Sequence, residues 1–447
     1  MAVFLALSLA YAHFTPAWQA PDEPAHYAFV QYLAERGQLP VLAPGDYPEG
    51  NPPGPRTRLT DVSAYRYESH QPPLYYALEA VDYRLTGGNL FALRALTAVL
   101  GMLLLPLVFL CARQLLPRQP WLWLATTAFV AFIPMHLFDD GTLDNDALAD
   151  LVTAAVLVLF LAIARGRRPR WRWPFMGVLV GLAVLTKLTD YAPVILLALL
   201  ACALAPSPAA AGEGRVRVPI APLMRALGIT GAVALAVSGW WLVRNGLIYG
   251  WGDLLAQHRQ AAVAASQVQT GGLRGFDVGR FVTTTFNSFW GQFGWMSIPL
   301  PRRDYEALLA LTLVAVAGWC AVAWQELAAS RRAGRLVMPP FDVHPKSWAA
   351  KTCLADLLQA PQMLWTGVEL TFVAVLAEDV YYNLTFVQPQ GRYLYPALIP
   401  IALFYVCGVA ALTPRRAAPL LAIVLGGGML LFALIALRQT LIPAFGT

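Results

Sequence analysis

The chain has 447 residues, of which 58% are hydrophobic and only 13% charged, and its formal net charge is +6. A soluble domain is close to half apolar and a quarter charged, so the surplus apolar side chains need a second place of burial, which a bilayer provides. The basic residues stand in short clusters between apolar runs. This pattern is typical of loops on the cytoplasmic side of a membrane and argues against nucleic acid as a partner.

Eleven apolar runs have about the length that a membrane-spanning helix needs, roughly 17–25 residues. They fall near residues 2–18, 89–111, 121–138, 146–164, 172–187, 190–206, 226–243, 305–328, 361–386, 393–412 and 417–437. The first run is short enough to be a signal peptide. It lacks the basic start and the small-residue cleavage site of one, so a first transmembrane helix is the favoured interpretation. The sequence therefore predicts an all-α integral membrane protein with about eleven transmembrane helices.

Every second loop between these runs is basic, which places those loops in the cytoplasm. The five loops contain Arg113 and Arg118; Arg165, Arg167, Arg168, Arg170 and Arg172; Arg215, Arg217 and Arg225; Arg331, Arg332, Arg335, Lys346 and Lys351; and Arg415 and Arg416. The opposite face then holds two long segments, 19–88 and 244–304, and three short ones around 139–145, 187–190 and 387–392. We expect one polytopic domain over residues 1–447 in a bacterial inner membrane.

The first long segment, 19–88, combines tyrosines and Pro-rich turns with amphipathic stretches such as His26–Leu33. Long segments between the spans of a compact protein are usually functional or disordered. The apolar content of this one favours an extracytoplasmic cap of helices lying on the membrane surface. The segment 244–304 is the second long extracytoplasmic loop.

Acidic residues are scarce, and Asp22 and Glu23 stand immediately after the first apolar run. One interpretation is structural, because Asp22 followed by Glu23 and Pro24 is a good helix start. The other is catalytic, because a carboxylate at the membrane boundary has a lower-dielectric surrounding that raises its pKa toward the working range of a general base.

A second acidic cluster, residues 139–146, follows the third apolar run. It contains Asp139, Asp140, Asp144 and Asp146. Four carboxylates at the mouth of two apolar helices are costly unless they are solvated or paired. A solvated turn, with Asp144 or Asn145 capping the next helix, is one interpretation. A site facing a cation, a metal or a polar substrate is the other.

Three cations are predicted on the same side of the membrane: Lys187, Arg244 and Arg392. Each, taken singly, is explained by a side chain that snorkels to the lipid headgroups. Taken together near several carboxylates, they better fit a phosphate-bearing substrate, because Arg engages phosphate oxygens with a planar fork. Gly391 precedes Arg392 and allows close approach of the backbone.

His70 opens the run His70-Gln-Pro-Pro-Leu-Tyr-Tyr76. A hydrogen-bonded histidine is the simpler interpretation, while a divalent metal ion held by His70 with Asp22 or Glu23 stays open as a cofactor. The run Ser288-Phe-Trp-Gly-Gln-Phe-Gly-Trp-Met296 is typical of an aromatic patch at the membrane interface, and a sugar-stacking surface is the second interpretation.

These motifs together resemble the glycosyltransferase C (GT-C) superfamily, which includes protein O-mannosyltransferases and aminoarabinose transferases. The resemblance rests on Asp22-Glu23 after a short first helix, a helical outer loop, the second Asp cluster, the His70 run and Leu185-Thr-Lys187. More narrowly, Ser288-Phe-Trp-Gly-Gln-Phe-Gly-Trp and Gln390-Gly-Arg-Tyr-Leu-Tyr-Pro396 are similar to an uncharacterised bacterial membrane-protein family, domain of unknown function 2142. The similarity extends over nearly the whole chain.

The resemblance implies a transferase that moves a sugar from a polyprenyl-phosphate donor, with inversion, to a cell-envelope acceptor at the extracytoplasmic face. Asp22, with Glu23 beside it, would be catalytic, and Asp140, Asp144 or Asp146 would match the second acidic motif. The remaining assignments put phosphate or donor binding on Lys187, Arg244, Arg392 and Tyr393, and the acceptor or sugar on His70, Gln71 and Tyr75.

No soluble acceptor-binding domain is evident, so the acceptor is expected to be small, lipid- or glycan-linked, or delivered by another protein. Two other classes of function fit the same composition. A flippase or transporter for a lipid-linked glycan would also carry intramembrane charges, although no repeated halves are visible. A non-catalytic envelope scaffold is the third, because fold resemblance alone does not establish activity.

Overall fold

The structure, a computed structural model, describes residues 1–47, 61–167, 169–205, 220–265, 267–333 and 362–445. It is built almost entirely of helices. The main bundle contains α1 (Ala2–Phe14), α4 (Leu90–Leu115), α5 (Pro120–Ala131), α6 (Pro134–Asp139), α7 (Asp146–Ala164), α8 (Arg172–Val184), α9 (Tyr191–Ala203), α10 (Ile220–Tyr249), α13 (Arg302–Ala333), α15 (Gln362–Thr385), α16 (Leu398–Leu412) and α17 (Ala418–Ala436).

Shorter elements connect these helices. They are α2 (Glu23–Arg36), α3 (Leu74–Thr86), α11 (Gln257–Val263), α12 (Val278–Gly291) and α18 (Ile442–Phe445), the 3₁₀ turns η1 (Leu188–Asp190), η2 (Gly272–Arg274), η3 (Gly391–Ala397) and η4 (Arg415–Ala417), and the π-helical turn η5 (Leu437–Leu441). Strands β1 (Gln292–Phe293) and β2 (Ile298–Pro299) form a small antiparallel hairpin, with Gln292 opposite Pro299.

Each predicted apolar run contains a helix, and the predicted all-α membrane fold is confirmed. Among the described residues, six helical stretches are long and apolar enough to cross a membrane: α4, α7, α10, α13, η3–α16 and α17–α18. Four shorter apolar helices, α1, α5, α8 and η1–α9, add to these. The figure of eleven crossing helices stays a prediction. The third run is not one helix, because α5 ends at Ala131 and Pro134, which cannot continue a helix, begins α6.

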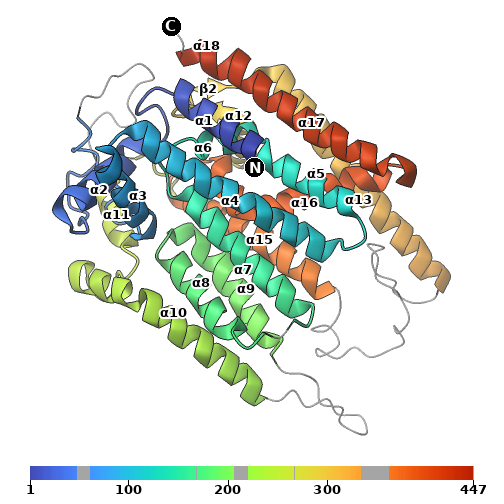
Figure 1. Cartoon of the computed structure of the whole chain (residues 1–447), viewed down its shortest axis with the longest axis horizontal. Coiled ribbons are helices and arrows are strands. Elements are labelled where there is room, and N and C mark those ends of the chain that lie inside the picture. The colour runs from blue at the N-terminus through green and yellow to red at the C-terminus, as the bar shows by residue number, and fades with distance from the viewer. Residues whose placement is uncertain (48–60, 168, 206–219, 266, 334–361, 446–447) are drawn as a thin grey trace.

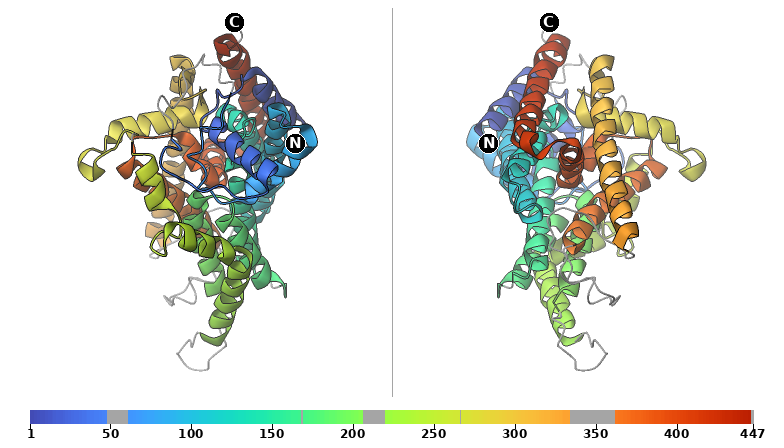
Figure 2. Two further views of the ribbon diagram at one scale, coloured as in Figure 1. Left: turned by 90° about the vertical axis from the view of Figure 1, so that its left-hand side faces the viewer. Right: turned by 90° about the vertical axis from the view of Figure 1, so that its right-hand side faces the viewer.

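Helix α7 forms the centre of the bundle, where it packs against α4, α8, α9 and α15. In the most apolar 18-residue stretch of α7, 72% of the residues are buried inside the protein. In the most apolar stretch of α10, only 17% are buried. Helix α10 therefore lies at the edge, where it packs mainly on α8. Figures 1 and 2 show α17 (red) and α10 (yellow-green) on opposite sides of the molecule.

The described parts of segment 19–88 include two helices, α2 and α3, which pack against each other. Each ends at a glycine with positive φ, Gly37 or Gly87, the usual helix C-cap. Helix α11, from the second long segment, lies at the same end of the bundle as α2 and α3 (Figure 1). Several basic loop residues of the sidedness prediction lie outside the described residues: Arg168, Arg215, Arg217, Arg335, Lys346 and Lys351.

Candidate active site

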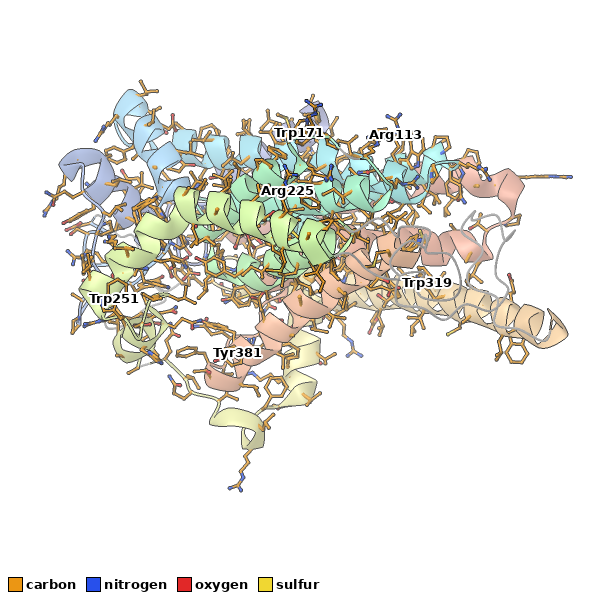
Figure 3. The ribbon with its side chains drawn as sticks, turned by 90° about the horizontal axis from the view of Figure 1, so that it is seen from below. Arg113, Trp171, Arg225, Trp251, Trp319 and Tyr381 are labelled. Atoms are coloured by element: carbon orange, nitrogen blue, oxygen red, sulfur yellow. The ribbon has the colours of Figure 1, made fainter. Side chains whose placement is uncertain are left out.

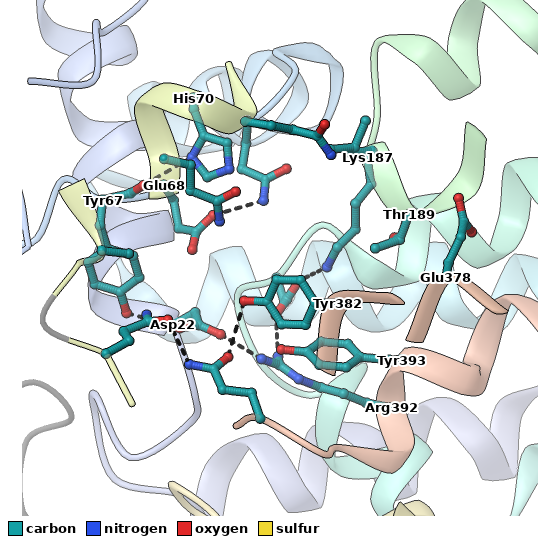
Figure 4. A pocket seen from close by; sticks show the side chains of 18 of the residues that line it. Asp22, Tyr67, Glu68, His70, Lys187, Thr189, Glu378, Tyr382, Arg392 and Tyr393 are labelled. Carbon is teal, nitrogen blue, oxygen red and sulfur yellow. Dashed lines mark hydrogen bonds and ion pairs between the residues drawn. The ribbon is translucent and has the colours of Figure 1, made fainter. Parts of the chain in front are cut away.

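A polar cavity lies where α2, α11, α15 and η3 meet the ends of α7 and α8. Figure 4 shows its charged and aromatic side chains pointing toward one another. The lining includes most of the predicted site residues: Asp22, His70, Gln71, Asp144, Lys187, Arg392 and Tyr393. These residues come from segments that are far apart in the sequence, so the fold itself builds the cavity.

Arg392 is the centre of this cavity. Its guanidinium donates from Nη1 to Oδ2 of Asp144 at 2.7 Å, from Nη2 to Oδ2 of Asp22 at 2.5 Å, and from Nε to Gln390 at 2.8 Å. The side chain of Arg392 is only 4% exposed, as is expected of a buried cation that opposite charges compensate. One guanidinium therefore joins the two predicted acidic motifs.

The backbone holds Arg392 in place through its neighbour Gly391. A Cβ atom on Gly391 would lie 2.1 Å from the backbone nitrogen of Phe289, so only glycine permits this approach of η3 to α12. The Gly391 N–H donates to Oγ of Ser288 at 2.8 Å, and the Tyr395 hydroxyl donates to the Phe289 carbonyl at 3.0 Å. The two sequence runs that carry the narrower family resemblance thus pack directly against each other.

Lys187 is the second cation of the cavity. It follows the end of α8 and forms ion pairs with Asp146, at the first turn of α7, and with Asp144, at 3.6 Å. Asp146 also lies 3.8 Å from Nη1 of Arg392. Asp22, Asp144 and Asp146 thus share two cations, as expected of acids at the mouth of apolar helices. Asp139 and Asp140, from the same acidic cluster, are buried and do not take part in this network.

His26 lies on the other side of Asp144. Its Nε2 is 3.6 Å from Oδ2 of Asp144, and its Nδ1 is 2.8 Å from the hydroxyl of Tyr76. Burial acts to lower the pKa of His26, but the charge and hydrogen bond of Asp144, together with the charges of Glu68 and Asp22, outweigh burial and raise this pKa above its ordinary value. Burial likewise acts to raise the pKa of Asp144, yet Lys187, His26 and Arg392 hold it well below its usual range.

Asp22 precedes α2 but does not cap it through its side chain. It has a φ of 63°, a left-handed conformation that is uncommon for aspartate and is often found at functional sites. Its carboxylate accepts hydrogen bonds from Arg392 and from the Tyr67 hydroxyl, the latter at 3.0 Å. The Asp22 side chain is 26% exposed, against 3% for Asp144, so Asp22 is the more accessible carboxylate to a molecule in the cavity.

Five predicted site residues are not in the cavity lining: Glu23, Asp140, Asp146, Tyr75 and Arg244. Asp146 reaches the cavity through its ion pair with Lys187, whereas the other four make contacts elsewhere. Glu23 is fully buried and forms a two-pronged pair with Arg94, both N···O distances being 2.7 Å. Arg94 also donates to the carbonyls of Ala12 and Thr15. The start of α2 turns Glu23 toward α4, away from Asp22, and gives it a structural role.

Asp140, Tyr75 and Arg244 also make contacts outside the cavity lining. Asp140 is buried beside His136 Nε2, at 3.2 Å, and occupies space that Gly101 of α4 leaves open. Tyr75 is fully buried and hydrogen-bonds Thr97 at 2.6 Å. Arg244 donates to the Pro40 carbonyl at 2.6 Å and stacks on Trp241, so it braces the outer segment.

The aromatic run of residues 288–296 is also corrected in part. Trp290 and Phe293 are fully buried in the apolar core, where Trp290 packs against Phe129 and Tyr405. They form bundle core, not an interfacial surface. Nδ1 of His70 donates to the Tyr67 carbonyl at 3.0 Å, a contact consistent with the simpler interpretation of a hydrogen-bonded histidine.

Sequence reasoning missed several residues of the cavity wall. They are His26, Tyr47, Tyr67, Glu68, Gln257, Gln260, Gln267, Glu378, Asp379, Tyr382 and Gln388. His26 could have been found, because it stands four residues after Asp22, the spacing that brings side chains to one helix face. The glutamines of α11 and its flank carry no motif.

A divalent metal ion does not fit the charged groups of this cavity. Within the described residues, no group of three His, Cys, Asp or Glu side chains could hold a metal ion. The three carboxylates that would be its natural ligands are engaged by Arg392 and Lys187. The chemistry proposed below therefore uses no metal.

A mostly apolar cavity lies on the other side of η3, between α12, α13, α15 and α16. Aromatic side chains dominate its wall, among them Phe281, Trp319, Trp365 and Phe404. Leu394 lines this cavity, whereas Arg392 and Tyr393 line the polar one. The 3₁₀ turn η3 is thus a wall common to both cavities.

The sequence matches the model of a family described as predicted membrane proteins, DUF2142, over residues 46–338. The chain belongs to the DUF2142 family. The predicted resemblance to that family is thereby confirmed. Of the charged residues around the polar cavity, Lys187 and the Asp144–Asp146 pair lie within the matched region of the DUF2142 model, while Asp22 and Arg392 lie outside it.

Two solved structures of ArnT from Cupriavidus metallidurans resemble this DUF2142 protein over 99% of its chain and 73% of theirs. The one bound to undecaprenyl phosphate has a TM-score of 0.50, the apo state has 0.51, and both are 15% identical in sequence. The GT-C fold predicted from the sequence is therefore confirmed. The oligosaccharyltransferase AglB from Archaeoglobus fulgidus matches with a TM-score of 0.46 and 13% identity, over 99% of this chain and 55% of its own. No curated protein matches the sequence.

Proposed function

We propose that the protein is a membrane glycosyltransferase that moves a sugar from a polyprenyl-phosphate donor to a cell-envelope acceptor, with inversion at the anomeric carbon. The observation that carries the proposal is the meeting of Asp22, Arg392 and Lys187 in one cavity. A partly exposed carboxylate and two buried cations are the groups that such a transfer needs. The GT-C fold supports the same class of reaction.

Arg392 and Lys187 are proposed to bind the donor phosphate. A guanidinium has five N–H donors, and the hydrogen bonds described above occupy one on each nitrogen of Arg392. One N–H remains on each terminal nitrogen, and these two form the fork that engages phosphate oxygens. Lys187 adds a point charge beside them. The ArnT structure that holds undecaprenyl phosphate is consistent with a lipid phosphate as ligand.

The apolar cavity beyond η3 is proposed to hold the polyprenyl chain. Arg392 and Leu394 are two residues apart but line different cavities. A phosphate held by Arg392 would therefore enter the polar cavity while the hydrocarbon attached to it lies against Leu394 and α16. Burial of isoprene units in such a cavity contributes about 25 cal/mol for each Å² removed from water.

The reaction follows from this placement. The acceptor hydroxyl gives its proton to Asp22 as its oxygen bonds to the anomeric carbon, and the bond from that carbon to the phosphate oxygen breaks. The leaving polyprenyl phosphate keeps the electron pair, and Arg392 and Lys187 stabilise its charge. Attack from the face opposite the phosphate inverts the configuration. Asp22 acts as base, and Tyr67 orients its carboxylate.

Lining residues on the far side of the cavity suit the sugar or the acceptor. Gln71 and His70, which the sequence analysis assigned to the acceptor or sugar, line the cavity with Glu68 and the glutamines of α11. Tyr393 lies next to Arg392 and keeps its assignment to donor binding. Amides, carboxylates and aromatic rings are the groups that bind hydroxyls and sugar faces. We propose that this cavity opens on the extracytoplasmic side of the inner membrane, opposite the basic loops.

The test is a transfer assay with purified protein in liposomes. Undecaprenyl phosphate carrying radiolabelled glucose, mannose, arabinose or N-acetylglucosamine serves as donor, and an extract of cell-envelope lipids and glycans serves as acceptor. Wild-type protein should release or transfer one of these sugars. Asp22→Asn should lower turnover by about a hundredfold or more while donor binding is retained.

Asp61→Asn is the matched control, because Asp61 is an exposed carboxylate of the same outer segment. It should leave turnover unchanged. Donor binding without turnover in the wild-type protein, with every acceptor fraction, would shift the proposal toward a flippase or a scaffold. Movement of labelled donor between leaflets, measured in the same liposomes, would then separate these two.

A further inference from the structure

A further cavity, whose polar lining consists of arginines, lies among the start of α8, the end of α9 and the start of α10. These helix ends belong to loops that the charge pattern places in the cytoplasm, so this basic cavity is at the opposite end of the bundle from Arg392. Three arginines line it: Arg170 and Arg172 from the start of α8 and Arg225 from α10. Among the residues that the structure describes, those that line the cavity include no acidic side chain.

The basic cavity is partly preorganised. The guanidinium of Arg172 lies 4.8 Å from the ring centre of Trp173 and donates from Nη1 to the Pro169 carbonyl at 3.2 Å. Trp173 is buried and forms part of the cavity wall. A guanidinium stacked on a ring loses little side-chain freedom when it binds an anion, which favours binding.

Large exposed apolar side chains occur near these arginines in the sequence. Trp171 is 56% exposed and Phe175 43%, at the start of α8, while Ile220 is 69% and Met224 59% exposed, in the stretch of α10 that precedes Arg225. Figure 3 shows Trp171 and Arg225 on the face of the molecule seen from below. Tryptophan and exposed aliphatic residues around basic residues are typical of the boundary between lipid tails and headgroups.

We propose that the basic cavity binds the phosphate headgroup of an anionic phospholipid of the inner leaflet. The phosphodiester pairs with Arg170, Arg172 and Arg225, and the acyl chains lie along Phe175, Ile220 and Met224. Arginine suits this ligand because its planar fork matches phosphate oxygens. The apolar surroundings distinguish a lipid from a free phosphate ion, which would gain nothing from them.

The bound lipid would join α10 to the bundle. Helix α10 packs mainly on α8, where Gly177 and Gly181 allow close contact: a Cβ on Gly177 would lie 2.6 Å from the Thr230 carbonyl oxygen. Arg170 and Arg172 precede or begin α8, and Arg225 lies near the start of α10. One headgroup that contacts all three would hold the two helix ends together, so the lipid should stabilise the folded protein.

The experiment compares lipid binding and thermal unfolding of the purified full-length protein in detergent micelles. Phosphatidylglycerol and phosphatidylcholine are added separately, and bound lipid is counted by native mass spectrometry. Wild-type protein should retain phosphatidylglycerol at least tenfold better than phosphatidylcholine and unfold at a higher temperature in its presence. The double variant Arg170→Gln/Arg225→Gln should lose both effects.

The double variant Arg113→Gln/Arg416→Gln is the control, because it removes the same charge from two other basic loops. It should behave as wild type. Arg170→Lys/Arg225→Lys keeps the positive charges but loses the planar guanidinium groups. It should retain a smaller preference for phosphatidylglycerol over phosphatidylcholine. An unchanged preference in Arg170→Gln/Arg225→Gln would overturn the proposal, as would displacement of the lipid by 10-fold excess inorganic phosphate. Neither readout depends on sugar transfer.

Discussion

Nη2 of Arg392 lies 2.5 Å from Oδ2 of Asp22, although 370 positions separate the two residues in the chain. The same guanidinium reaches Asp144 at 2.7 Å, so it stands between a partly exposed carboxylate and a buried one. The proposed base and the proposed phosphate-binding group are therefore linked before any substrate enters. Changes at Arg392 should affect both the folded state and the reaction.

The first prediction concerns Arg392→Gln. It leaves the buried Asp144 with one cation fewer, and breaking a buried pair costs about 3–5 kcal/mol. Thermal unfolding in detergent should show a large loss of stability. Arg392→Lys keeps the charge but cannot bridge two carboxylates, so its loss should be intermediate. Arg302→Gln, which removes an exposed ion pair with Glu306, should have no measurable effect.

The second prediction separates Glu23 from its neighbour Asp22. Glu23→Gln removes the charge that faces Arg94 in the interior, so the protein should lose several kcal/mol of stability. Donor binding and turnover by the protein that remains folded should be within about twofold of wild type, because Glu23 does not line the cavity. A hundredfold lower turnover at unchanged stability would instead make Glu23 catalytic.

The third prediction is a pH dependence of stability from Glu79 in α3. Burial, with a smaller contribution from Asp82, raises the pKa of Glu79 from 4.5 to about 9. The folded protein thus holds a proton that the unfolded chain releases, so this contribution to stability is complete below pH 4.5 and is lost as pH rises toward 9.

The variant Glu79→Gln should remove that loss, because its amide does not titrate. Its melting temperature should change less between pH 5 and pH 9 than that of wild type, and should exceed the wild-type value at the alkaline end. Glu35→Gln, at an exposed position of α2, is the matched control and should follow the wild-type curve. Parallel curves for wild type and Glu79→Gln would contradict the prediction.

The fourth prediction concerns Gly391→Ala. The new methyl group would meet the Phe289 backbone nitrogen at 2.1 Å, and backbone atoms of a packed helix cannot yield cheaply. We expect η3 to shift, with loss of the Gly391–Ser288 hydrogen bond and displacement of Arg392. Stability and donor binding should both fall. Gly427→Ala, where a Cβ meets nothing within 4 Å, provides the control.

The helices and their approximate bounds could be predicted because lipid burial leaves long apolar runs in the sequence. Asp22, Lys187 and Arg392 could be predicted as one group because each is a rare charge at a helix end on the same predicted face. Neither argument could tell Asp22 from Glu23. Adjacent residues diverge here because Asp22 has a left-handed backbone just before α2, and no periodicity encodes that turn.

Other parts of the site depend on tertiary contacts that leave no local pattern. Arg94 lies inside an apolar run, and its partner Glu23 is 71 positions away. The glutamines of α11 face the cavity only because of how α10 and α11 are joined. In each case the sequence contains the side chain, but it does not indicate which helix or loop the side chain contacts in the folded protein.

The bridge between Asp22 and Arg392 has a consequence for biogenesis. Asp144 and Asp146 enter the membrane with α7, long before the ribosome has made Arg392. Until η3 has been synthesised and has folded against the bundle, Lys187 is the only one of the two cavity cations that can pair with these acids. We expect insertion intermediates that end before η3 to expose these carboxylates to water or to a chaperone.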